Sequence, residues 1–211
     1  NYMFPEAHAF AFGVTAYHMA WLKYYYPKEF FTAIFNQQPM GFYNLETLKE
    51  DAKRHGIKFL NPDVNLSAVK CKIVEVENIE YIILGLMNVK KVGHVNSLNI
   101  VRAREVFGGF KSISDLFNKT HINRSVLENL ALSGALDKIM PDRRSALWEI
   151  GAHFKDRNNS DSFPSMFESE LPKLEKFSDW EIMSGEYKSM GIYVKGHIMK
   201  EVRKKIDFRL S

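Results

Sequence analysis

The sequence has 211 residues, of which 45% are hydrophobic and 26% are charged, and its net charge is +4. A chain of this length and composition can bury a hydrophobic core, which excludes a disordered polypeptide, and it fits one large domain or two small ones. The single cysteine, Cys71, excludes an intrachain disulfide and favours an intracellular protein with this residue as a small buried hydrophobe. No apolar run approaches the about 18 residues that a membrane span needs. The opening residues read like the approach to a helix, which indicates a fragment of a longer protein.

The first third of the sequence predicts helices. Residues 7–26 are apolar and aromatic, and Pro27 should end or kink their helix before a second one that reaches Phe35. Residues 44–56 have the features of a capped helix, with Asn44 as N-cap, acidic residues early, basic residues late and Gly56 at the stop. One side of the first helix is traced by residues three or four positions apart, namely Ala9, Phe12, Ala16, Met19, Ala20 and Lys23.

The period of the sequence then changes from helical to alternating. The stretch VKCKIVEVE alternates apolar and polar residues, and NIEYIILGL follows after a short polar junction. This pattern predicts a small β-hairpin between Val69 and Leu84.

A helical pattern returns after Met87. Residues 156–173 are rich in Ser, Asn, Asp and Pro and predict a loop or linker. The fold class expected is therefore mainly α with a small β-hairpin. The later helices are predicted at about 95–107, 110–117, 123–134, 143–154 and 180–190.

The stretch from Gly85 to Arg104, GLMNVKKVGHVNSLNIVRAR, could be a metal site, a phosphate loop, a nucleic-acid clamp or a basic helical corner. His94 has no second His or Cys at ligand spacing and Cys71 stands alone, which argues against zinc, so no metal site is expected. The Walker pattern G-x-x-x-x-G-K-S/T is absent, which excludes nucleotide binding by that loop.

A helix–hairpin–helix is the third option for this stretch. In that motif a tight turn of a small residue, an apolar residue and glycine leads into a second helix, whose first N–H groups point at a DNA phosphate. Val92-Gly93 would form the turn, and a corner of two helices with a solvated basic face is the alternative. The candidate DNA-binding residues here are Lys90, Lys91, Val92, Gly93, His94, Asn96 and Arg102, with Arg104 nearby.

A second unit, THINRSVLENLALSGALD, has the same outline without a glycine in its turn. Asn123, Arg124 and Ser125 would lie at its phosphate-facing end. An ordinary capped helix is the alternative interpretation of this unit.

Five separated stretches, in one order, resemble bacterial C-family DNA polymerases, the alpha subunit of DNA polymerase III. FPEAHAFAFGVTAYHMAWLKYYYPKEFFTAIFN is similar to the fingers, and DAKRHGIKFLNPDVN to the stretch that follows them. LGLMNVKKVGHVNSLNIVRARE and LENLALSGALD are similar to the family's helix–hairpin–helix segments, and EYKSMGIYVKGHIM to the helix that leads toward its oligonucleotide-binding fold. The fingers residues that carry the resemblance are Phe4, His8-Ala9, Ala16-Tyr17, Trp21-Leu22-Lys23 and Pro27.

Some details separate the branches of that family. Glu6 stands where replicative members usually have Lys, and NQQPMGFYNLETL and EYKSMG resemble the error-prone members. Two positions depart from the family: Lys91 replaces the hairpin's usual first glycine, and Ile198 replaces the Pro that usually follows the histidine.

The resemblance implies an order of domains. Residues 1–62 would be the C-terminal part of the fingers, 63–86 a β-hairpin connection, and 87–155 the duplex-binding region. A linker, 156–175, and a helix toward an OB-type domain, 176–211, would follow.

By the same resemblance, the parent would be a DNA-directed DNA polymerase of the bacterial cytoplasm that uses Mg²⁺ in its palm. The palm aspartates should precede residue 1, and no Asp-x-Asp pair occurs in this sequence. The fragment is therefore expected to bind no cofactor and to be inactive alone. Glu75-x-Glu77 and Glu168-x-Glu170 are expected to be solvated pairs.

The resemblance also suggests functional contacts. His8 and Lys23 would face the nucleotide or the template, although His8 could instead cap or pack and Lys23 could lay its aliphatic stem along an aromatic face. The expected partners are duplex primer–template DNA, the rest of the polymerase chain and, further, a sliding clamp or mutagenesis accessory proteins. The alternatives are an interdomain scaffold or accessory-protein docking segment with little DNA contact, and an independent repair protein.

Overall fold

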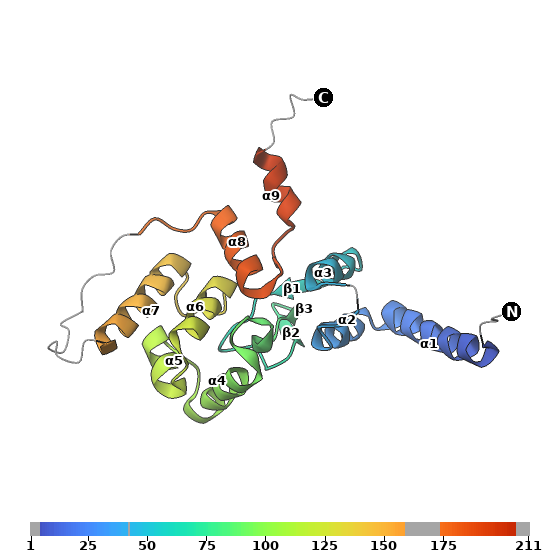
Figure 1. Cartoon of the computed structure of the whole chain (residues 1–211), viewed down its shortest axis with the longest axis horizontal. Helices are drawn as coiled ribbons and strands as arrows, with labels where there is room; N and C mark the ends of the chain where they lie inside the picture. Colours follow the sequence, from blue (N-terminus) through green and yellow to red (C-terminus); the bar gives the residue numbers. More distant parts are fainter. Residues whose placement is uncertain (1–4, 42, 159–173, 206–211) are drawn as a thin grey trace. The chain divides into compact units, whose positions relative to one another are not determined.

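The computed structural model describes residues 5–41, 43–158 and 174–205. The chain divides into two compact units, residues 1–58 with 73–82 and residues 59–72 with 83–211. Helices dominate both units and a small sheet accompanies them, which confirms the predicted fold class (Figure 1).

The first unit begins with three helices, α1 (Glu6–Tyr25), α2 (Pro27–Asn36) and α3 (Leu45–Arg54). Pro27 occupies the first turn of α2, where its missing N–H has no helical partner to lose, so the predicted break falls at Tyr26. Phe31 and Phe35 of α2 form the core of this unit together with Leu48 and Ala52 of α3. Asn44 caps α3 as predicted, because its side chain accepts a hydrogen bond from the Thr47 N–H at 2.9 Å.

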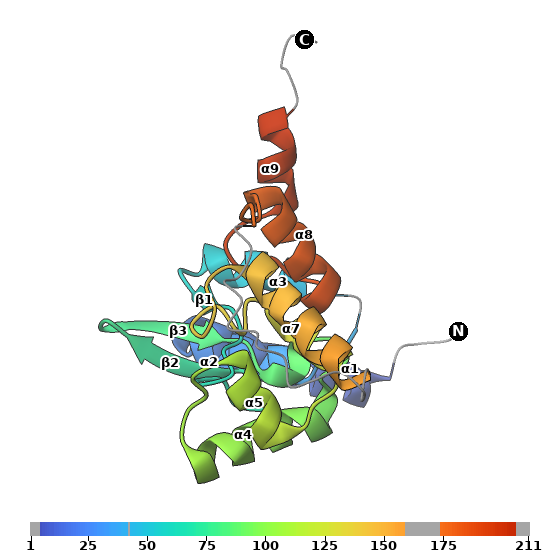
Figure 2. The same cartoon turned by 90° about the vertical axis from the view of Figure 1, so that its left-hand side faces the viewer.

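A β-hairpin forms where the alternating pattern predicted it, from β2 (Lys72–Val76) and β3 (Ile79–Ile83) (Figure 2). Its two turn residues, Glu77 and Asn78, both have positive φ, 53° and 59°, as a two-residue type I′ turn requires. A third strand, β1 (Lys58–Leu60), completes the sheet in the order β1-β3-β2. This strand was not predicted, because three residues are too few to show an alternating pattern.

The second unit contains the remaining helices. Its core includes Leu127 and Leu130 of α6, Ile100 of α4 and Leu116 of α5, all fully buried. Helix α6 packs against both α7 and α8. The helical elements are η1 (Leu86–Asn88), α4 (Gly93–Phe107), α5 (Ile113–Thr120), α6 (Arg124–Ser133), α7 (Arg143–Asn158), α8 (Asp179–Met190) and α9 (Ile198–Lys205).

Helix limits differ slightly from the prediction. Helix α4 begins at Gly93, two residues before the predicted start near Val95. Helix α7 continues to Asn158, past the predicted end at Phe154, so the predicted loop loses its first residues. The rest of that loop, with Glu168 and Glu170, lies outside the described residues, and so does Phe4.

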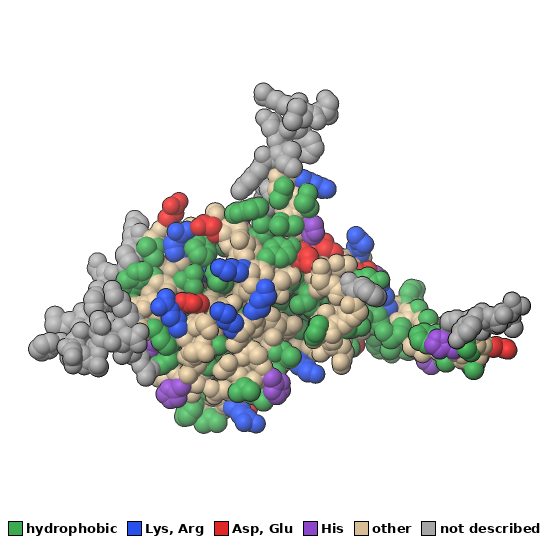
Figure 3. Space-filling view, in the orientation of Figure 1, with side chains coloured by type: hydrophobic (Ala, Val, Ile, Leu, Met, Phe, Trp, Pro, Cys, Tyr) green, Lys and Arg blue, Asp and Glu red, His purple; other side chains and the backbone are tan. Residues whose placement is uncertain are grey.

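Helix α1 buries none of its residues. Phe10 and Tyr24 are 75% and 78% exposed, and hydrophobic side chains run along the surface of this helix (Figure 3). The side of α1 that carries Ala9, Phe12, Ala16 and Met19 is therefore not buried by any described helix or strand of this unit. Within the described part of the chain, no helix is both long and apolar enough to cross a membrane.

Candidate nucleic-acid interface

The first hairpin connects η1 to α4 through four residues, Val89 to Val92. Lys91 and Gly93 both have left-handed backbone conformations, with φ of 66° and 61°, and Val92 between them is only 2% exposed. A Cβ on Gly93 would meet no atom within 4 Å, so the backbone angle and not crowding favours glycine there. The turn is thus tight although Lys91 replaces one of the expected glycines, a conformation that costs an ordinary residue about 1–2 kcal/mol.

Polar side chains close this turn from inside α4. The Asn96 side-chain amide donates to the Val92 carbonyl at 2.9 Å, and the Ser97 hydroxyl donates to the Gly93 carbonyl at 2.5 Å. Asn96 therefore shapes the hairpin from a half-buried position.

Lys90, Lys91 and His94 lie at the turn and are exposed, and neither lysine forms an ion pair with a described residue. Arg102 is also exposed, farther along α4. Arg104 differs, because its guanidinium donates to two backbone carbonyls, those of Val64 at 3.0 Å and Ser67 at 2.9 Å. Arg104 thus holds the segment before β2 in place and is not a candidate contact.

The second hairpin connects α5 to α6 through His121, Ile122 and Asn123. His121 has φ of 51° and ends α5, with its N–H donating to the Phe117 carbonyl at 2.7 Å. Ile122 is 2% exposed, and Asn123 caps α6 by accepting from the Val126 N–H at 3.0 Å.

The predicted DNA-contact residues of the second hairpin already form hydrogen bonds or ion pairs with other residues of that hairpin. The Ser125 hydroxyl donates to the Asn123 side-chain oxygen at 2.9 Å, and Arg124 forms an exposed ion pair with Glu128 at 2.7 Å. The capping alternative therefore describes Asn123 correctly, while the hairpin outline is also present.

The two turns begin in the same way, although their third residues differ, since Gly93 has φ of 61° and Asn123 has φ of −77°. In each, a residue in the left-handed region, Lys91 or His121, precedes a buried β-branched residue and then the start of a helix. The prediction omitted His121, because it used glycine as the sign of the turn. A helix end followed by a β-branched residue and an N-cap residue would have located it.

A direct hydrogen bond joins the two hairpins. The Asn99 side-chain amide, on α4, donates at 2.6 Å to the carbonyl of Thr120, the residue before His121. The N-terminal turns of α4 and α6 therefore belong to one framework within the second unit.

The two candidates in the first unit lie on α1. His8 is exposed and its ring lies 4.3 Å from the ring of Phe12. The Lys23 ammonium pairs with Asp51 at 2.7 Å and lies 5.4 Å from the centre of the Phe31 ring, beside a pocket of about 380 Å³. Lys23 thus has a carboxylate partner as well as an aromatic neighbour.

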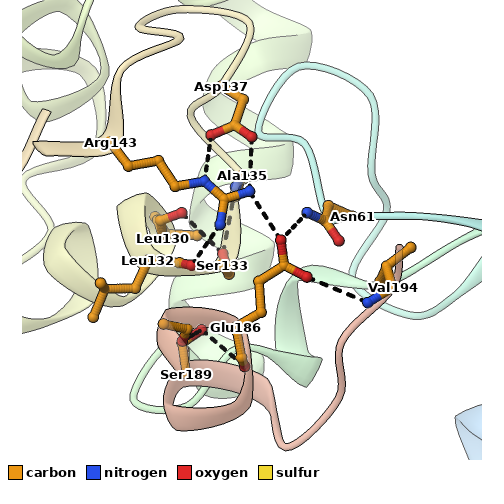
Figure 4. Close-up of polar contacts among 11 residues, drawn as sticks. Asn61, Leu130, Leu132, Ser133, Ala135, Asp137, Arg143, Glu186, Ser189 and Val194 are labelled. Carbon is orange, nitrogen blue, oxygen red and sulfur yellow. Dashed lines mark hydrogen bonds and ion pairs between the residues drawn. The ribbon is translucent and has the colours of Figure 1, made fainter. Parts of the chain in front are cut away.

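A buried polar network stabilises the second unit (Figure 4). The Arg143 guanidinium donates to both carboxylate oxygens of Asp137, at 2.9 and 2.8 Å, and to Glu186 at 3.0 Å. Asn61 donates to the same Glu186 carboxylate at 2.8 Å, and the Val194 N–H donates to its other oxygen at 3.3 Å. Burial raises the pKa of Glu186, and the nearby Arg143 charge lowers it in part. This network links segments that are far apart in sequence.

Cys71 is a buried thiol, as expected, and it donates to Asn88 at 3.2 Å. Burial raises its pKa to about 11, so it stays protonated at neutral pH. Across the described residues, no group of three or more His, Cys, Asp or Glu side chains is arranged to hold a metal ion.

The pair of hairpins defines the class of the second unit, a helix–hairpin–helix module. In agreement, the family described as "Helix-hairpin-helix motif" matches residues 56–146.

Known relatives then identify the larger family. The chain is 32% identical to an error-prone DNA polymerase of Corynebacterium jeikeium, with 98% of this chain and 20% of that protein aligned. The error-prone DNA polymerase of Corynebacterium glutamicum is 34% identical over 98% of this chain and 19% of its own length, and that of Vibrio vulnificus is 33% identical over 93% and 19%. The chain is a homologue of these polymerases, which confirms the resemblance to the C family and to its error-prone branch. It spans about one fifth of the length of the relatives that it matches.

Proposed function

We propose that this chain provides the sequence-independent grip on duplex DNA of an error-prone DNA polymerase, within residues 87–155. The observation that carries the proposal is that a left-handed residue followed by a buried β-branched residue precedes both α4 and α6, with Lys90 and Lys91 exposed beside the first. Homology to error-prone DNA polymerases supports the same role.

The chemistry of the grip follows from phosphate recognition. Backbone N–H groups at the starts of α4 and α6 can donate to phosphate oxygens, and the helix dipoles favour that negative charge. Lys90, Lys91 and Arg102 add the charge term, which depends strongly on salt. Contacts of this kind position a duplex but do not read its bases, so binding should be similar for all sequences.

The test is fluorescence anisotropy of a short labelled duplex at two salt concentrations. Replacing Lys90 and Lys91 by Glu should weaken binding for every sequence and lower the salt slope, by about 0.9 for each phosphate that the protein no longer neutralises. A matched control replaces Lys176 and Lys195 by Glu. Both are exposed, and they line a pocket beside Arg143. Equal affinity of the K90E/K91E variant and the unchanged protein at low salt would refute the role.

The catalytic activity of the parent is a second part of the proposal. The parent would be a DNA-directed DNA polymerase, a nucleotidyltransferase of the bacterial cytoplasm, with Mg²⁺ held by palm aspartates that this sequence lacks. The purified chain should therefore not extend a primer. Metal-dependent primer extension by the chain alone would contradict this assignment.

The first unit would contribute to the fingers. His8 and Lys23 would approach the template or the incoming nucleotide. For Lys23 to contact either one, its ion pair with Asp51 would have to open; if the pair stays closed, Lys23 supports α1 instead. A sliding clamp or mutagenesis accessory proteins would be further partners of the parent.

An interdomain scaffold is the second candidate, and the exposed apolar surface of α1 favours it. An exposed surface of this kind commonly marks contact with another protein. The salt titration separates the two candidates, because a scaffold would show no salt-sensitive affinity for duplex DNA.

A further inference from the structure

Helix α8 makes a backbone contact with the first hairpin. The N–H of Lys90 donates to the carbonyl of Ser189 at 2.8 Å. Lys90 directly precedes the left-handed residue Lys91, so this bond fixes the chain where it enters the turn. Helix α8 lies outside residues 56–146, which the helix–hairpin–helix family covers.

The position of α8 is itself strongly determined. Glu186 lies three residues before Ser189 on α8 and is fully buried. Its carboxylate accepts hydrogen bonds from Arg143, Asn61 and the Val194 N–H (Figure 4). Gly185 lies against α6, where an added Cβ would be 3.3 Å from the Leu132 side chain. The Ser189 carbonyl is therefore presented to the hairpin from a fixed helix.

We propose that α8 is a positioning element of the duplex grip, which sets the first hairpin through the Lys90–Ser189 hydrogen bond. The Asn99–Thr120 hydrogen bond joins α4 to the second hairpin. The Lys90–Ser189 hydrogen bond holds the first turn on its other side, where the chain enters it. The inference rests on the proposed duplex binding. It adds that residues 179–190 are needed for that binding because they hold the first hairpin in place.

A pair of variants isolates the hydrogen bond. Lys90→Ala removes the ammonium and keeps the N–H, whereas Lys90→Pro removes both. Val89, the residue before, already has the extended conformation, φ −82° and ψ 123°, that precedes proline readily. Lys90→Pro should bind the duplex about two- to thirtyfold more weakly than Lys90→Ala, the range expected for loss of coupling between packed elements.

A second measurement keeps the proposal testable if Lys90→Pro fails to fold. Glu186→Gln removes the charge and one acceptor that hold α8, and amide hydrogen exchange then reports on each hairpin separately. The Lys90 amide should exchange at least about tenfold faster than in the unchanged protein, while the His121 amide, bonded to Phe117 within α5, should change little.

The outcomes are distinct. Equal affinities of Lys90→Pro and Lys90→Ala, or an equal rise in exchange at Lys90 and His121, would overturn the role of α8. If the unchanged protein shows no salt-sensitive duplex binding, the proposed function fails first. If it binds, but Lys90→Pro binds like Lys90→Ala and Glu186→Gln does not speed exchange at Lys90 above that at His121, the proposed function stands and this inference fails.

Discussion

Arg143 and Glu186 form an ion pair in the interior of the second unit, with 3.0 Å between Nη2 and Oε1, and they come from positions 43 residues apart. Glu186 is fully buried and Arg143 is 5% exposed. Without Arg143, the fully buried Glu186 would be an uncompensated charge, which is strongly destabilising, whereas Arg143 has a second carboxylate partner in Asp137.

Arg143→Leu should therefore lower the free energy of unfolding by about 3–5 kcal/mol. Arg144→Leu is the matched control, since Arg144 pairs with Glu181 at a half-exposed site, and it should cost at most about 1 kcal/mol. Urea denaturation of the three proteins gives the comparison. Similar losses for both variants would mean that the buried pair adds nothing beyond a surface pair.

Gly134→Ala tests the crowding beside the same network. Gly134 ends α6 with φ of 84°, and an added Cβ would lie 2.4 Å from Nη2 of Arg143. Gly191 ends α8 with a similar φ of 75° and has no neighbour within 4 Å, so Gly191→Ala shows only the backbone cost, about 1–2 kcal/mol. Thermal unfolding should place Gly134→Ala clearly below Gly191→Ala, and equal melting temperatures would contradict the role of crowding.

Glu149 provides a pH-dependent prediction. Burial raises its pKa above the ordinary value of 4.5, so the folded protein binds this proton more tightly than the unfolded chain. The resulting contribution to stability is full below the unfolded pKa and is lost as the pH rises through the folded pKa. Glu149→Gln should therefore be more stable than the unchanged protein at pH 7, with a difference that shrinks toward pH 4. A difference that grows on acidification would show the opposite sign of shift.

Lys91→Gly should separate stability from binding. Relief of the left-handed lysine gains about 1–2 kcal/mol, and the greater freedom of glycine in the unfolded chain returns about 0.5–1 kcal/mol. The variant should thus be slightly more stable, yet bind duplex DNA more weakly, with a salt slope lower by about 1. Asn78→Gly changes a residue of similar φ in the β2–β3 turn and should leave duplex affinity unchanged. Stronger binding by Lys91→Gly would show that the lysine obstructs the turn.

Local rules predicted the elements well, because their causes lie within a few residues. Asn44 and Asn123 cap helices as their side-chain chemistry indicated, and Pro27 separates α1 from α2. The alternating pattern located the hairpin between Val69 and Leu84.

Features that depend on distant residues could not be predicted in this way. The Arg143–Glu186 pair and the Lys90–Ser189 bond join segments whose proximity only the folded core determines. His121 was missed for a different reason, since a non-glycine residue in the left-handed region has no reliable sequence sign. Lys91 was identified as unusual, but only the backbone angles establish that the turn keeps its form.

The exposed helix α1 also has a consequence for the order of the first unit. A helix of 20 residues that buries no side chain lacks the packing from which most helical stability in proteins comes. Its own hydrogen bonds then give it only marginal persistence, so its amides should exchange far sooner than those of α2, which carries Phe31 and Phe35 in the core. The stability of α1 thus depends on a partner that packs against it, and slower amide exchange in α1 would report that such packing has formed.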